Sequence, residues 1–193
     1  MSDTIKDHLG LIADLAEKAF ANHEMSVVTE DDEGKTYVYR CRRPGSWAYG
    51  FTVIFRPGFV AVYGDTGDIV LNHGDGDSRA WVRRQQAPHF DYMLKKRPHG
   101  CRPPDEFMSG EVNLWLKERI EECCGDNEDA ATWREARREW IGGDRSPDDA
   151  IEIVQDVYGD TEVVDGFYAP NSTSVWGCHA LMCWKRLFEA RNP

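Results

Sequence analysis

Five arginines have the side-chain type and spacing to bind an anionic ligand. They form two groups in the chain: Arg40, Arg42 and Arg43, then Arg83 and Arg84. On a strand, positions 40 and 42 share one face, and guanidinium groups donate forked hydrogen bonds to carboxylates or phosphates. The five arginines therefore predict a ligand- or anion-binding site. The alternative is that the first group pairs with the carboxylates of residues 30–33.

A second cluster has residue types that could hold a metal ion. His73, Asp75 and Asp77 offer imidazole and carboxylate ligands in a glycine-rich segment. The longer ligand ladder of a helix–loop–helix calcium site, which ends in a bidentate glutamate, is absent. These residues are thus candidates for a weak divalent-cation site. Nearby, residues 65–67 (Asp-Thr-Gly) match the catalytic triplet of aspartic proteases, but their place between two β-rich runs predicts a hairpin turn.

Sequence patterns of common enzyme sites are missing from the chain. It contains no phosphate-binding loop ending in Lys-Ser/Thr, no nucleophile elbow and no zinc-binding His-Glu-x-x-His helix. The six cysteines do not have zinc-site spacing, and the six histidines have no sequence-local partner. We therefore predict no catalytic residue and no cofactor, and the sequence favours a protein that is not an enzyme.

The net charge of −11 is concentrated in one stretch. Residues 104–165 have 19 acidic and 6 basic side chains, whereas residues 75–103 have 3 acidic and 7 basic ones. The acidic stretch is open to two interpretations, solvated helix faces or a mimic of nucleic acid. Its mixed charges favour local pairs on helices. The acidic balance also makes direct binding to duplex DNA an unfavourable hypothesis.

Neither export nor a membrane span is expected from the sequence. No run approaches 18 apolar residues, and the polar start lacks the pattern of a secretory signal. We therefore expect a cytoplasmic protein whose cysteines are reduced thiols.

The fold class predicted from the periodicity is α+β. Period-two alternation and Pro-Gly or Gly-Asp turns predict a four-stranded antiparallel meander over residues 35–72. Helical spacing predicts further helices over residues 3–21, 78–86, 110–124, 127–141 and 147–158, and a final helix over residues 174–190. Residues 160–173 are predicted to be a loop.

The predicted organisation is a helix plus meander over residues 1–86, a proline-rich connector over 87–106, and a helical half over 107–193 that packs on the sheet. Together these parts are expected to form one domain. The meander is expected to pack against the first and last helices, with Trp176, Trp184 and Phe188 buried. The alternative for the apolar last helix is a homodimer interface.

The hairpin segment resembles a family of phage and prophage proteins of no settled activity. The resemblance lies in Arg40-x-Arg42-Arg43-Pro44-Gly45, a second Pro-Gly turn at residues 57–58, and Val62-x-Gly64-Asp65-x-Gly67. It continues loosely through residues 107–115 and the closing helix 176–188, and it departs at the polar residues 72–79. The resemblance implies phage origin and the cytoplasm of a bacterial host.

Three functions are compatible with these observations. The first is a phage-encoded binding protein that inhibits a bacterial antiviral defence system, a CRISPR effector or a signalling defence, by binding a host defence protein. This hypothesis is associational, since small acidic phage proteins often act in this way. The second is a sponge that sequesters a nucleotide immune signal with the five arginines. The third is a metal-dependent enzyme that acts on nucleotides at residues 73–77.

Overall fold

The computed structural model describes residues 3–74, 76–85, 90–98, 105–123 and 127–192. The chain divides into two compact units. The sheet unit comprises Leu9–Pro104 and Asn171–Pro193, and the helical unit comprises Met1–His8 and Asp105–Pro170. The last helix thus belongs to the same unit as the strands. Packing of the helical half on the sheet stays a prediction.

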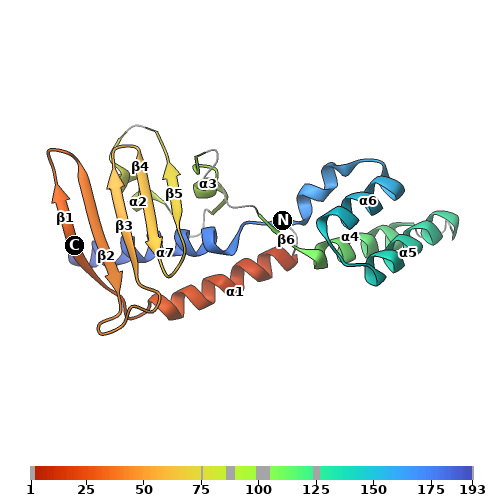
Figure 1. Ribbon diagram of the computed structural model, residues 1–193, viewed down its shortest axis with the longest axis horizontal. Coiled ribbons are helices and arrows are strands. Elements are labelled where there is room, and N and C mark those ends of the chain that lie inside the picture. Colours follow the sequence, from red (N-terminus) through yellow and green to blue (C-terminus); the bar gives the residue numbers. More distant parts are fainter. Residues whose placement is uncertain (1–2, 75, 86–89, 99–104, 124–126, 193) are drawn as a thin grey trace. The chain divides into compact units, whose positions relative to one another are not determined.

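The sheet has five antiparallel strands in sequence order (Figure 1). They are β1 (Glu24–Asp31), β2 (Thr36–Arg42), β3 (Phe51–Arg56), β4 (Phe59–Gly64) and β5 (Ile69–Asn72). The α+β class and the meander are confirmed, but the prediction of four strands was wrong by one. It missed β1, an edge strand whose side chains are mostly exposed, so it lacks the alternation of a half-buried strand.

The turns between the strands have the expected chemistry. Pro57 and Gly58 alone connect β3 to β4, and Gly58 has a φ of 71° that glycine adopts without strain. Residues 65–68 connect β4 to β5, so the Asp-Thr-Gly triplet lies in a turn. Gly64 is required by close packing, because a Cβ there would lie 2.3 Å from the carbonyl oxygen of Gly50.

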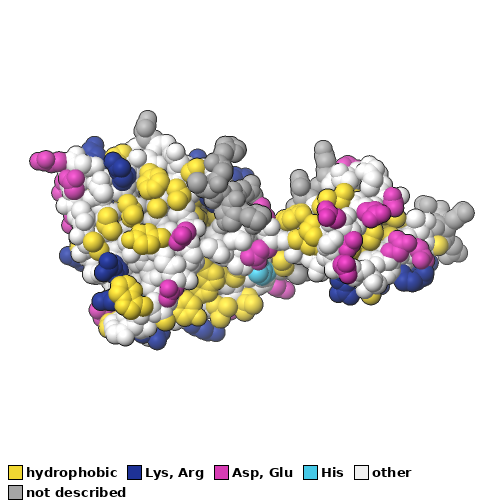
Figure 2. Space-filling view, in the orientation of Figure 1, with side chains coloured by type: hydrophobic (Ala, Val, Ile, Leu, Met, Phe, Trp, Pro, Cys, Tyr) yellow, Lys and Arg dark blue, Asp and Glu magenta, His cyan; other side chains and the backbone are white. Residues whose placement is uncertain are grey.

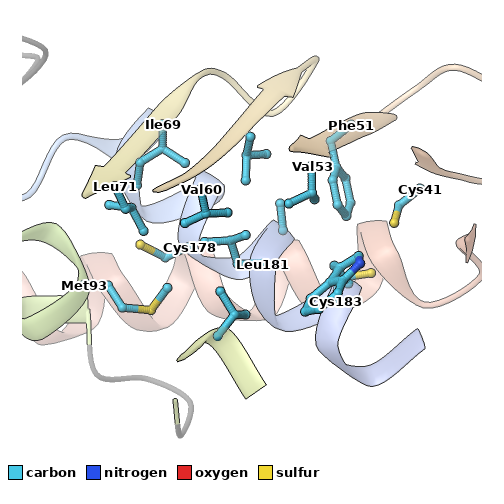
Figure 3. Close-up of a cluster of buried hydrophobic side chains, with 14 of the residues drawn as sticks. Cys41, Phe51, Val53, Val60, Ile69, Leu71, Met93, Cys178, Leu181 and Cys183 are labelled. Atoms are coloured by element: carbon cyan, nitrogen blue, oxygen red, sulfur yellow. The ribbon is translucent and has the colours of Figure 1, made fainter. Parts of the chain in front are cut away.

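Helices cover one face of the sheet, which we call the inner face. They are α1 (Asp3–Phe20), α2 (Ser78–Arg84), α3 (Phe90–Leu94) and α7 (Ser172–Arg191), and α2 and α7 lie behind the strands in Figure 1. Figure 3 shows Val60 and Leu71 pointing toward Cys178 and Leu181 of α7, and all four side chains are fully buried. The packing of first and last helices on the sheet is confirmed.

The burial predicted for the last helix is confirmed only in part. Trp184 is fully buried, whereas Trp176 and Phe188 are half-buried. Trp176 lies at the border of the core, where it stacks on the exposed ring of Tyr49, and Phe188 lies beneath the guanidinium of Arg83. Helical periodicity predicts which side of a helix is apolar, but not how far the sheet extends over it.

The helical unit has its own core. It contains α4 (Ser109–Glu122), α5 (Asn127–Gly142), α6 (Pro147–Tyr158), the 3₁₀ helix η1 (Thr161–Phe167), and a two-stranded ribbon of β6 (Glu106–Phe107) and β7 (Tyr168–Ala169). The loop predicted over residues 160–173 was therefore wrong. The ribbon pairs segments about 60 residues apart, which no local pattern reveals.

Two predicted features of the helical unit are present. Ser146 accepts a hydrogen bond from the amide of Asp149, whose carboxylate accepts one from the amide of Ser146, so α6 begins with a capping box. The acidic stretch contains local ion pairs on the helix surface: Lys117–Glu121, Arg119–Glu122 and Arg138–Glu135.

Candidate binding face of the sheet

The other face of the sheet, which we call the outer face, is not covered by any described helix of the sheet unit (Figure 1). Alternation along β2 places Tyr37, Tyr39 and Cys41 in the core, so Val38, Arg40 and Arg42 point to the outer face. Each outer side chain of β2 is half-buried by its neighbours on the same face. The face is therefore a packed surface that remains open to solvent.

Aliphatic side chains form a continuous row across this face. Val38 is opposite Ile54, Ile54 is opposite Ala61, and Ala61 is opposite Val70. Residues directly opposite each other in antiparallel strands have Cβ atoms about 5 Å apart, so the four side chains are in lateral contact. We call these four residues the apolar row. Figure 2 shows hydrophobic side chains gathered over these strands with basic side chains at the border.

Two arginines and a tryptophan form the border of the outer face on β2. The guanidinium carbon of Arg42 lies 4.5 Å from the ring centroid of Trp47, and that of Arg40 lies 5.6 Å from it. Both distances are within the range of a cation–π interaction. Trp47 is 61% exposed. We call this group the arginine–tryptophan stack.

The carboxylates of residues 30–33 are not the partners of these arginines. Glu30 accepts a hydrogen bond from the hydroxyl of Tyr39 at 2.9 Å, and Asp32 accepts one from Tyr37 at 2.8 Å. Both tyrosines lie on the inner side of β2. The structure therefore does not contain the alternative arrangement, in which the arginines pair with the carboxylates of residues 30–33.

The cation beside those tyrosines is Arg79. Its guanidinium carbon lies 3.2 Å from the ring centroid of Tyr37, and its Nη1 donates to the hydroxyl of Tyr39 at 3.1 Å. Burial raises the pKa of Tyr39 to about 12, so this hydroxyl keeps its proton. These contacts close the inner side of β2 and leave the outer side to Arg40 and Arg42.

The five arginines do not converge on one site. Arg83 lies on the inner side, where its Nε is 3.8 Å from Glu189 and its guanidinium carbon is 5.6 Å from the ring centroid of Phe188. Arg84 is exposed on the same helix. Arg43 is exposed in the loop after β2. Burial lowers the pKa of His23, and the charge of Arg43 lowers this pKa further.

Two residues of the predicted metal cluster make other contacts in the structure. Asp77 caps α2, its Oδ1 accepting from the amides of Arg79 and Ala80. His73 stacks on the ring of Trp81, with centroids 4.6 Å apart. Asp75 lies outside the described residues. In the part of the chain that the structure describes, no three metal-ligating side chains form a group.

His73 and Ser78 form a hydrogen bond, but they are not a nucleophile and its base. In such a pair the serine hydroxyl would donate to the histidine. His73 Nε2 is 2.8 Å from Ser78 Oγ, which also accepts from the amide of Phe59. The single hydroxyl proton of Ser78 is donated to the carbonyl of Arg56. A carbonyl only accepts, so His73 must be the donor to Ser78. Burial lowers the pKa of His73. This arrangement is a structural junction between α2 and the β3–β4 turn.

A cavity of about 440 Å³ adjoins that junction. Its walls include Tyr37, Phe55 and Arg56, but none of the five predicted arginines. A pocket of this size accommodates a small molecule. This cavity is therefore not the anion site predicted from the five arginines.

Comparisons with known proteins give this chain no relative: no protein-family model, curated protein or solved structure matches it. None of the helices in the described ranges has both the length and the apolar character to cross a membrane.

Proposed function

We propose that the chain is a non-enzymatic binding protein that docks a partner protein on the outer face of its sheet. The apolar row is the observation that carries this proposal. Val38, Ile54, Ala61 and Val70 are contiguous across four strands, and no described helix of the sheet unit covers them. A contiguous uncovered apolar patch with a polar border is typical of a protein–protein interaction site.

A protein suits this face better than a nucleic acid. The net charge of −11 opposes binding to a phosphate backbone, which depends on a sustained positive surface. Aliphatic side chains beside arginine and tryptophan instead match the centre of protein interfaces, where binding energy concentrates on tryptophan, tyrosine and arginine.

The narrower role that we propose is inhibition of a bacterial antiviral defence system in the host cytoplasm, by occupation of a defence protein's surface. Its support is the resemblance of the hairpin segment to phage proteins. An inhibitor of this kind needs a binding face and no catalytic group, which agrees with the chemistry of the outer face.

The test places one charge in the apolar row. Ile54→Lys puts an ammonium group at the centre of the row, and the matched control Ile151→Lys makes the same change on α6, where Ile151 is 43% exposed. Full-length wild type and both variants are immobilised and exposed to lysate of phage-infected bacteria. Proteins retained by wild type and Ile151→Lys but lost by Ile54→Lys are then purified, and their dissociation constants are measured.

We expect at least one such protein to bind wild type directly, and Ile54→Lys to weaken that binding at least tenfold. Val70→Lys, at the end of the row, repeats the test if Ile54→Lys lowers the melting temperature. The proposal is overturned if correctly folded row variants retain the same proteins as wild type. The narrower role is tested by phage plating on hosts with and without a defence system, where only wild type and Ile151→Lys should restore plating.

A further inference from the structure

We infer that the arginine–tryptophan stack is the point at which this face recognises a carboxylate side chain of its protein partner. The inference rests on the proposed function for the identity of the partner. It adds that the partner has an apolar strip with aspartate or glutamate beside it. The reasons are the unpaired state of the two guanidinium groups, the fixed position of the indole and the place of the stack on the face.

The guanidinium groups of Arg40 and Arg42 have no carboxylate partner among the described residues. Glu24 is directly opposite Arg42 in the register, yet no ion pair joins them. The contact that both side chains make is with the ring of Trp47. A stacked guanidinium has its plane covered, while the N–H groups at its edge remain available for a bidentate bond to a carboxylate.

Partial burial makes this arrangement favourable for a ligand. Arg40 and Arg42 are half-buried, so part of their hydration is already lost. Their long side chains are also already ordered by the indole, so less conformational entropy is lost when a partner binds. A carboxylate arriving at this point gains two charge-assisted hydrogen bonds without first having to order the arginines.

The loop that presents Trp47 is anchored by two hydrogen bonds and a ring contact. The amide of Gly50 donates to the carbonyl of Trp47 at 2.7 Å, and His23 Nε2 bonds to the carbonyl of Tyr49 at 3.0 Å. Tyr49 also stacks on Trp176, with centroids 5.7 Å apart.

Tyr49 has a φ of 59°, a left-handed conformation that is unfavourable for an aromatic residue. Such a conformation persists where surrounding contacts impose it, and it is found most often at binding sites. The loop therefore adopts an unfavourable backbone conformation at Tyr49, next to the segment that places an exposed indole beside two arginines.

A carboxylate is favoured over a phosphate as the group that binds. Guanidinium groups recognise both anions. The stack, however, is continuous with the apolar row, since Arg40 and Val38 are neighbours on the outer face of β2. A nucleic acid would have to place phosphates next to aliphatic side chains on a protein of net charge −11. A protein surface can offer apolar and acidic side chains together.

The test uses small anions as probes, so it does not need the partner. Glutarate, its neutral analogue glutaramide and inorganic phosphate are titrated into ¹⁵N-labelled full-length protein. NMR follows the Nε–H resonances of Arg40 and Arg42 and the Nε1–H of Trp47. Variants are Arg42→Gln, which removes the donor fork, and the control Arg83→Gln, which removes an inner-side arginine. Each variant is first checked for an unchanged melting temperature.

Glutarate should shift these resonances with millimolar affinity and glutaramide should not. Arg42→Gln should weaken glutarate binding at least tenfold, whereas Arg83→Gln should leave it within twofold. The inference is refuted if no shift occurs up to about 100 mM glutarate, or if Arg83→Gln weakens binding as much as Arg42→Gln. Phosphate binding at least tenfold tighter than glutarate would also refute it and would indicate a nucleic-acid partner. These results do not depend on the apolar row, so they are separable from failure of the Ile54→Lys test.

Discussion

Replacement of Trp184 by alanine tests the packing that holds the sheet on α7. Trp184 is fully buried, and its ring centroid lies 4.3 Å from that of Phe55 and 5.6 Å from that of Tyr39. Burial of a tryptophan removes about 200 Å² from water, and at about 25 cal/mol per Å² most of the roughly 5 kcal/mol is lost on truncation to Cβ. The indole Nε1–H has no acceptor among the described residues, and removing this buried donor returns about 1 kcal/mol.

We therefore expect Trp184→Ala to lower the free energy of unfolding by about 3–4 kcal/mol. Trp184→Phe is the matched variant, because it keeps a ring and removes the N–H, and it should cost less than about 2 kcal/mol. Urea unfolding followed by circular dichroism measures both values. A loss below about 1 kcal/mol for Trp184→Ala would refute the packing argument. Equal losses for the two variants would refute the stabilisation assigned to the buried ring, because both variants remove the N–H and only Trp184→Phe keeps a ring.

Two further predictions concern α7 and the first helix. Gly177→Ala should lower the free energy of unfolding by about 1–2 kcal/mol, because its Cβ would lie 2.5 Å from Ile69 Cγ2, whereas Gly10→Ala, with open space, should raise it by about 0.5–1 kcal/mol. Burial lowers the pKa of His179 from 6.5 to about 4, so the unfolded state binds the proton more tightly and stability falls as pH drops through this interval. Between pH 7 and pH 5 the wild type should lose about 1–2 kcal/mol more than His179→Gln, measured by urea unfolding at both pH values.

Elements with a strong local pattern were predictable, and elements defined by distant partners were not. Residues 36–42 alternate strictly because one side faces the core, and Ser146 marks a helix start whose capping atoms are all local. In contrast, β1 lies at the sheet edge with both sides largely solvated, so burial imposes little pattern on it. The ribbon of residues 106–107 and 168–169 exists only through a pairing across the helical unit.

The position of the candidate site also depends on packing between elements that are distant in the sequence. Strand periodicity predicts that Arg40 and Arg42 share a face, but which face the helices cover depends on how α1 and α7 pack. The acidic residues 30–33 are near the arginines in sequence, but Glu30 and Asp32 bind the hydroxyls of Tyr39 and Tyr37. These tyrosines lie on the inner side of β2, whereas Arg40 and Arg42 lie on its outer side, because side chains alternate along a strand.

The place of Trp47 in the site was not predictable from the strand pattern. Trp47, Tyr49, Phe51, Val53 and Phe55 are at alternate positions, which is the pattern of a single strand with these side chains on one face. In the structure β3 begins only at Phe51, and the left-handed Tyr49 reverses the chain before it. The indole of Trp47 lies beside Arg40 and Arg42 of the outer face. Trp47 is therefore 61% exposed, whereas Phe51, which begins β3, is buried in the core.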